Sequence, residues 1–330
     1  MFETTSPRRL LEHRVGQVLE LLAGVRDGND TAIHDTRVAT RRAREALVVG
    51  RGEYEQDVLS EIAETLQRTG RALGAVRDPD ALHALLVGLE SRFPLAGAAV
   101  SQLHAAIARE RQIGRRKLIK TLEALDLAAV PQRLRRARHR SRVFVHESPW
   151  RKQLRGHLAA RASELQEAIE HGTGVYFPNR SHSTRIGVKK LRYAVELSRE
   201  LQADAPQRVL RHLKKAQQTL GEMRDRQVLI DRLQPFESAG DRAGTTINLL
   251  EAEILALHER YVALRPDLVA ACRRVETAAQ HRPVGLHVAA AAVVVPSLFV
   301  MGRRLAGRDS RTDSPHTGTH ARNRPKLRVG

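Results

Sequence analysis

One stretch of the chain occurs twice, and this internal repeat limits the architecture more than any other feature. The sequence HDTRVATRRAREAL at residues 34–47 aligns with HSTRIGVKKLRYAV at residues 182–195, at an offset of 148 residues. A second pair follows in the same order, with LGAVRDPDALHAL at 73–85 and LGEMRDRQVLIDR at 220–232, at an offset of 147 residues. Two motifs repeated in one order at nearly one offset indicate a duplicated structural unit.

The repeated unit is expected to be helical, as is the rest of the folded chain. The intervals between prolines are rich in Ala, Leu, Arg and Glu, which favour helices, and no run of alternating β-branched residues predicts a strand. Aromatic residues make up only 3% of the 330 residues, so Leu, Ala and Val must form most of the core. The sequence therefore predicts an all-α protein. The expected helices span about 8–26, 31–49, 55–77, 79–91, 97–123, 131–145, 150–171, 180–202, 206–221, 226–238, 240–264 and 267–280.

The repeat also predicts the domain organisation. Residues 1–145 are expected to form a first helical half and residues 146–280 a second one. Residues 284–302 are nearly all apolar, and residues 303–330 are rich in Arg, Gly, Ser and Pro, which predicts a basic, disordered tail. The apolar segment is long enough to cross a bilayer, but an interruption at Pro296 favours a helix that packs on a bundle. Membrane contact through this segment and the basic tail stays open.

Each copy of the first motif places four basic or protonatable side chains along one stripe of its helix. At about 100° per residue, such a stripe covers an arc of about 80°. The stripes consist of His34, Arg37, Arg41 and Arg44 in the first copy, and of His182, Arg185, Lys189 and Arg192 in the second. Arg42 and Lys190 flank them, whereas Ala43, Leu47, Leu191 and Val195 lie on a face suited to the core.

These stripes lack the acidic residues that normally alternate with basic residues on a solvated helix face. Like charges four residues apart destabilise a helix by about 0.2–0.5 kcal/mol per pair. The whole chain has 56 Lys and Arg residues against 37 Asp and Glu residues, a formal net charge of +19. Such an excess is typical of proteins that bind polyanions, so a bound anion would supply the missing negative charge.

The second motif adds further cations close to each stripe. Its copies contribute Arg68, Arg71 and Arg77 in the first half and Lys214, Lys215 and Arg224 in the second. Asp78 and Asp225 directly follow an arginine in each copy. The two carboxylates either orient the guanidinium groups or mark a helix end, and the sequence favours both interpretations about equally.

With both motifs present in both halves, the chain resembles the CHAD family, the conserved histidine α-helical domain, over about residues 8–275. The resemblance implies two antiparallel helical bundles related by a pseudo-twofold axis, with a central basic cleft. It also implies binding of inorganic polyphosphate and association with polyphosphate granules in the cytoplasm. The implied ligand contacts are His34, Arg37, Arg41, Arg42, Arg44, His182, Arg185, Lys189, Lys190 and Arg192, followed by Arg68, Arg71, Arg77, Lys214, Lys215 and Arg224.

Nucleic-acid binding is the main alternative, because it requires the same positive charge. Proteins that bind single strands stack bases on aromatic side chains, and only Tyr193 lies beside a basic motif. Readers of duplex DNA commonly add Asn or Gln near the recognition helix, and neither stripe contains them. The pattern therefore favours a polymer of phosphates without bases.

A metal-dependent phosphohydrolase is the second alternative. His34 and Asp35 form the His-Asp pair of one such class, but Ser183 replaces the aspartate in the second copy. No phosphate-binding loop of the G-x-x-x-x-G-K-[ST] type and no H-E-x-x-H motif occurs, and Cys272 is the one cysteine of the chain. Cys272 is expected to be a buried, inert thiol. The sequence therefore predicts a non-enzymatic protein without metal or cofactor, and it leaves the oligomeric state open.

Overall fold

The computed structural model describes residues 6–51, 53–91, 98–138, 149–172, 176, 178–202, 207–235 and 243–280. Apart from two isolated bridge pairs, the described residues with regular structure are helical, which confirms the predicted all-α fold. The helices are α1 (Pro7–Arg26), α2 (Asp30–Gly50), α3 (Gln56–Glu90), α4 (Ala98–Ala124), α5 (Val130–Arg136), α6 (Pro149–Glu170), α7 (Pro178–Gln202), α8 (Gln207–Leu233) and α9 (Ala243–Gln280).

Three of these helices are longer than the sequence predicts. Helix α3 continues through Pro79, α9 continues through Pro266, and α8 runs without a break across residues 222–225. The predicted breaks at these places are wrong. A proline inside a helix costs about 3 kcal/mol, but in α3 the buried residues continue on both sides of Pro79, with Val76 before it and Leu82 after it. Burial of this continuous apolar stripe offsets the lost hydrogen bond.

The start of the chain shows how local signals set the helix boundaries. The side chain of Ser6 accepts a hydrogen bond from the Arg9 amide at 3.2 Å, and Pro7 occupies the first turn of α1. The side chain of Asn29 caps α2 in the same way, accepting from the Ala32 amide at 3.0 Å. Between α1 and α2, Gly28 adopts a φ of 77°, a left-handed conformation that glycine reaches without strain. This short turn returns α2 along α1.

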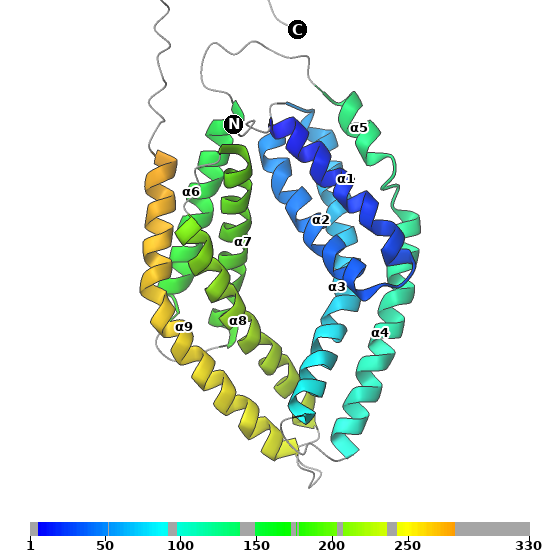
Figure 1. Ribbon diagram of the computed structural model, residues 1–330, viewed down its shortest axis with the longest axis vertical. Coiled ribbons are helices and arrows are strands. Elements are labelled where there is room, and N and C mark those ends of the chain that lie inside the picture. Colours follow the sequence, from blue (N-terminus) through cyan, green and yellow to red (C-terminus); the bar gives the residue numbers. More distant parts are fainter. Residues whose placement is uncertain are drawn as a thin grey trace, which may run out of the picture. The chain divides into compact units, whose positions relative to one another are not determined.

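The helices pack as two groups that follow the order of the chain (Figure 1). In the first group α1 packs on α2, α2 on α3 and α3 on α4, while α5 contacts α1 and α3. In the second group α6 packs on α7, α7 on α8 and α8 on α9, and α9 returns to contact α6. Most of these contacts join neighbours in sequence, as expected for helices connected by short turns.

Two regions of packing connect the groups. One core cluster contains residues from both groups, including Leu47 of α2 and Leu191 of α7, and α2 contacts α6 and α7 there. A second cluster joins the ends of the long helices, where Leu86 of α3 lies in one core with Ile230 of α8. Figure 1 shows these junctions near opposite ends of α3 and α8. The facing surfaces between the junctions carry the candidate site.

The chain divides into two compact units, Met1–Pro283 and Val284–Gly330. The apolar segment at 284–302 and the basic tail at 303–330 lie outside the described residues. The helix predicted at 131–145 is shorter than expected, because α5 ends at Arg136, and residues 139–145 of that prediction also lie outside the described residues. Among the described helices, none is long and apolar enough to cross a membrane.

Candidate functional site

The repeated motifs lie on α2 and α7, and each of these helices buries the face that the sequence predicts. Ala43 and Leu47 of α2 are 0% and 6% exposed, and Leu191 and Val195 of α7 are 0% and 2% exposed. The predicted core face is therefore confirmed in both copies. The apolar and the basic residues lie on different faces of each helix. When the apolar face packs into the core, the basic face is directed toward the space between the two groups of helices.

Two adjoining cavities lie along the basic face of α2. The first, here called the α2–α3 cavity, has a volume of about 470 Å³ and is lined by Arg37, Arg41, Arg44 and Arg71. Gly70 and Gly74 form part of its α3 wall. A Cβ atom at position 74 would lie 3.6 Å from the Arg37 guanidinium, which is an ordinary contact distance, so the α3 backbone packs close to this arginine.

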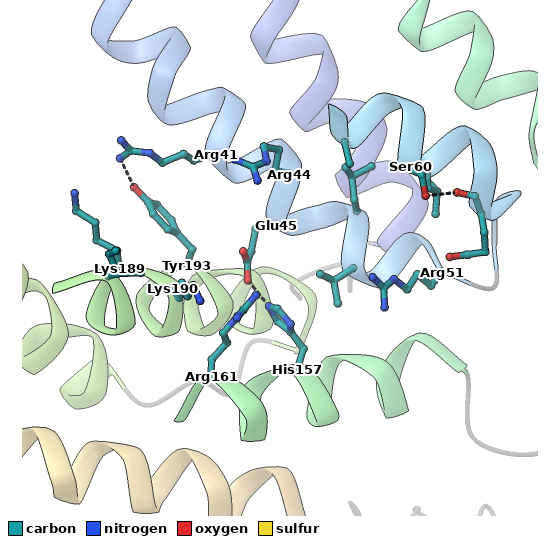
Figure 2. A pocket seen from close by; sticks show the side chains of 16 residues that line it. Arg41, Arg44, Glu45, Arg51, Ser60, His157, Arg161, Lys189, Lys190 and Tyr193 are labelled. Atoms are coloured by element: carbon teal, nitrogen blue, oxygen red, sulfur yellow. Dashed lines mark hydrogen bonds and ion pairs between the residues drawn. The ribbon is translucent and has the colours of Figure 1, made fainter. Parts of the chain in front are cut away.

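The second cavity, here called the α6–α7 cavity, has a volume of about 490 Å³ and lies between α2, α3, α6 and α7 (Figure 2). Its cationic residues are Arg41, Arg44, Arg51, Arg161, Lys189 and Lys190. Arg41 and Arg44 line both cavities, so the two cavities adjoin at these side chains. We refer to both cavities together as the cationic groove.

Several groove cations lack a carboxylate partner within the described part of the chain. No described Asp or Glu side chain lies within ion-pair distance of Arg41, Arg44, Arg185 or Lys189. Arg41 Nη1 instead donates to the Tyr193 hydroxyl at 3.4 Å, across the space between α2 and α7 (Figure 2). The Nε atom of Arg185 is buried without a hydrogen-bond acceptor among the described residues.

The pKa of Lys189 shows that the two stripes face each other. This pKa is lowered from 10.5 to about 7. Burial is the largest cause, and the nearby charges of Arg185, Arg41 and Arg37 contribute to the same shift. Arg185 belongs to the same helix, but Arg41 and Arg37 belong to α2 of the other half. The pKa of Arg185 is also lowered, first by burial, with Arg224 and Arg41 contributing and Asp225 opposing. Cations of both halves therefore repel one another across the groove.

The two motif histidines have different surroundings. Burial lowers the pKa of His182 below its usual value, and the charges of Arg224, Arg185 and Lys189 lower it in addition. His34 lies on the corresponding part of α2, where its Nδ1 accepts a hydrogen bond from Arg77 Nε at 3.3 Å. In the ligand-free protein His182 thus resists protonation.

Other residues of the predicted set are paired with the protein's own polar groups. Arg192 donates to Glu196 and to Gln217, both at 2.7 Å, and its guanidinium lies 4.4 Å from the centre of the Tyr193 ring. Lys190 lies 3.0 Å from Glu164. The remaining pairs are Arg37 with Asp78 at 2.7 Å, Arg42 with Glu196 at 4.0 Å and Arg224 with Asp231 at 3.9 Å.

The aspartates of the second motif lie inside helices α3 and α8, so they do not mark helix ends. Asp78 is exposed and pairs with Arg37. Burial raises the pKa of Asp225, although Arg185 and Lys189 act in the opposite direction. Arg68, Lys214 and Lys215 are exposed and line neither cavity of the groove.

The α6–α7 cavity also contains residues that the repeat does not predict. His157 and Arg161 belong to α6, and His157 Nε2 lies 2.5 Å from Glu45 of α2. These two residues lie outside both motifs, so no signal in the sequence connects them with the stripes. Their position follows from the packing of α2 against α6.

The groove's chemistry is that of anion binding. It offers arginine and lysine donors, and the described residues hold no group of three or more His, Cys, Asp or Glu side chains arranged to bind a metal. Cys272 is fully buried, as predicted, and burial raises its pKa to about 12. Fold and site together define an all-α protein with a cationic groove between two packed groups of helices.

Comparison with known proteins gives the family. The CHAD domain profile matches residues 9–234, and the chain belongs to the CHAD domain family. This confirms the resemblance that the repeated motifs suggest. A search of curated proteins finds no match to the chain.

Two solved structures share the fold. The crystal structure of the CHAD domain from the plant Ricinus communis aligns with a TM-score of 0.55 at 21% sequence identity, covering 81% of this chain and 90% of that one. The structure of PptA from Streptomyces chartreusis aligns with a TM-score of 0.52 at 16% identity, covering 83% of this chain and 97% of that one. At these identities the similarity is one of fold.

Proposed function

We propose that this protein binds inorganic polyphosphate in the cationic groove and does so without catalysing a reaction on it. The observation that carries the proposal is the set of cations contributed by both halves, Arg41 and Arg44 from α2 with Arg185 and Lys189 from α7, without a carboxylate of the described residues in ion-pair distance. The family membership of the chain supports the same ligand.

Polyphosphate fits this arrangement because it is a line of anionic phosphates without bases. A protein that binds it needs closely spaced charge-assisted donors and no groups that read a sequence. Arginine suits this role because its planar guanidinium stays charged and bridges neighbouring oxygens. The groove supplies four arginines along the α2–α3 cavity alone. Binding would place the protein at polyphosphate granules in the cytoplasm.

The contacts that we favour are the cavity-lining Arg37, Arg41, Arg44, Arg71 and Lys189. Arg185 joins this set because its charge acts on Lys189 and it lies close enough to Arg41 for the two charges to repel, although it lines neither cavity. Arg192 and Lys190 are held by Glu196 and Glu164, which reduces the positive charge they offer to a ligand. We therefore expect Arg192 and Lys190 to contribute less binding free energy than their alignment with Arg44 and Arg42 suggests. His34, His182, Arg77 and Arg224 line neither cavity. Arg77 donates to His34, and the charge of Arg224 acts on His182 and Arg185, so these two arginines add positive charge beside the stripes.

Titration with polyphosphate of defined chain length tests the proposal. The double variant Arg41→Ala/Arg44→Ala should bind about a hundredfold more weakly or worse, because each lost charge-assisted bond is worth about 1.5–3 kcal/mol and about 1.4 kcal/mol corresponds to a factor of ten. A matched control is Arg116→Ala/Lys117→Ala, which removes the same charge from exposed positions on α4 that line neither cavity. Equal loss in both variants would show a diffuse charge effect and contradict the assignment of the groove.

Competition separates polyphosphate from nucleic acid. Polyphosphate should displace single-stranded DNA of equal phosphate number, whereas the DNA should displace polyphosphate poorly, because the described groove residues offer no series of exposed aromatic rings on which successive bases of a strand could stack. Incubation with polyphosphate and a divalent metal should release no orthophosphate. Efficient displacement by DNA, or release of phosphate, would replace the proposal by one of the two alternatives.

A further inference from the structure

The α6–α7 cavity has an apolar wall that a chain of phosphates cannot use. Ile186 lines it and is 40% exposed, and it is the one of the five large exposed hydrophobic residues in the described part of the chain that lines either cavity. Val48 and Ala63 are partly exposed in the same cavity. These three residues come from α7, α2 and α3, so the wall is formed by both halves of the protein. Apolar surface that faces a highly charged cavity has no function in binding an inorganic anion.

Uncharged polar groups also line this cavity. Gln56 and Ser60 lie at the start of α3, and the Glu45–His157 pair connects α2 with α6 (Figure 2). Such groups donate and accept hydrogen bonds with direction, which a flexible phosphate chain does not require. Together with the apolar wall they form the combination typical of sites for organic ligands, namely aliphatic surface with a few polar groups that fix orientation.

The two arginines shared with the α2–α3 cavity limit the chemistry of such a ligand. Arg41 and Arg44 line both cavities, so a molecule in the α6–α7 cavity lies next to the phosphate-binding surface. A ligand that uses the wall, the polar groups and the arginines must combine a flat or apolar organic part with a run of phosphates. A volume of about 490 Å³ lies within the range of small-molecule sites.

We propose that the cationic groove also binds nucleoside polyphosphates, with the nucleoside in the α6–α7 cavity against Ile186 and Val48 and the phosphates on Arg41 and Arg44. The inference rests on the proposed function, because the phosphates of both ligands use the same arginines. The base lies against aliphatic side chains, so the site requires no aromatic ring. The polar edge of the base forms hydrogen bonds with Gln56, Ser60 or the Glu45–His157 pair.

Calorimetric titration with ATP, tripolyphosphate and adenosine, without divalent metal, tests this inference on the full chain. Tripolyphosphate is the matched ligand, because it has the same three phosphates and no nucleoside. ATP should bind more tightly than tripolyphosphate. Ile186→Ser should weaken ATP binding by about three- to tenfold, as expected for loss of one partly buried aliphatic contact, and leave tripolyphosphate binding unchanged.

Two further variants complete the design. Val48→Thr keeps the shape of the side chain and adds a hydroxyl, so it should weaken ATP binding in the same direction. Leu255→Ser changes an apolar residue of α9 that is 58% exposed and lines neither cavity, and it should change neither affinity. Circular dichroism confirms that each variant is folded.

The outcomes separate the inference from the proposed function. If tripolyphosphate binds but ATP binds no more tightly, or if Ile186→Ser weakens both ligands equally, the nucleoside site is wrong and the polyphosphate site stands. If ATP binds in an Ile186-dependent manner while long-chain polyphosphate does not bind, the nucleoside site stands and the proposed function is wrong.

Discussion

Lys189 is the residue whose state depends most on its surroundings. It is largely buried among Arg185, Arg41 and Arg37, and these conditions disfavour its charged form. The adjacent Lys190 differs in both respects, because it is exposed and lies 3.0 Å from Glu164. Both lysines line the α6–α7 cavity, but the helix sets them about 100° apart, so Lys189 lies among cations and Lys190 beside a carboxylate.

We predict that polyphosphate binding takes up protons through Lys189. Its pKa is about 7 in the free protein, and a bound polyanion favours the ammonium form, so the pKa rises toward 10.5 in the complex. Affinity should therefore increase as pH falls from about 9 to 7, by at most about tenfold per pH unit, and level off below 7. Titrations at several pH values with long-chain polymer, which has few end groups, measure this dependence.

Lys189→Arg provides the decisive comparison for this dependence, because arginine stays charged throughout the range. The variant should bind with little change between pH 7 and 9, whereas Lys190→Arg should behave as the wild type. His182 adds a separate effect at lower pH, since its pKa is lowered by burial and by Arg224, Arg185 and Lys189. A wild-type affinity that is constant from pH 7 to 9 would contradict proton uptake by Lys189 on binding.

Helices α2 and α7 share a motif but have diverged in what surrounds it. Arg44 on α2 aligns with Arg192 on α7, yet Arg44 is exposed in the groove while Arg192 is bound by Glu196 and Gln217. The position of Glu196 corresponds to Val48 in the first copy, which has no carboxylate to offer. One substitution, four residues along the helix, thus converts a ligand-binding arginine into one that stabilises its own helix.

This divergence predicts unequal effects of equivalent substitutions. Arg44→Ala should weaken polyphosphate binding by about tenfold or more, whereas Arg192→Ala should leave the affinity nearly unchanged and lower the thermal stability instead. Glu196→Val should release Arg192 and increase the affinity. Binding titrations and thermal melts of the three variants measure both quantities, and equal losses of affinity for the two arginine variants would contradict the asymmetry.

At the scale of the whole molecule, the fold holds like charges close together in the groove. The chain has a formal net charge of +19, and cations from both halves meet between two apolar junctions that hold the halves together. These junctions keep Arg41 close to Lys189 although the two charges repel each other. A polyanion that relieves this repulsion binds the folded state and stabilises it.

We therefore predict that the ligand and the loss of groove cations each stabilise the folded state, and that the two effects are not additive. Polyphosphate at about 100 times its dissociation constant should raise the free energy of unfolding by about 2.7 kcal/mol. Arg41→Ala/Arg44→Ala should raise the melting temperature of the ligand-free protein slightly, because it removes repulsion, and should reduce the gain from ligand. Differential scanning calorimetry at low ionic strength measures both effects. A double variant less stable than Arg116→Ala/Lys117→Ala would show that these arginines support the fold.

The sequence by itself determined the helical class, the family and the faces of α2 and α7. Helical periodicity and the repeated motifs are local, and they place Ala43 and Leu47 in the core and Arg37, Arg41 and Arg44 on one stripe without knowledge of any partner. The tertiary structure decided which charges stay unpaired. It carried α3 through Pro79, paired Arg192 with Glu196, and brought Arg161 and Ile186 beside Arg41. Burial and ion pairing depend on residues far apart in the chain, so no local pattern predicts them.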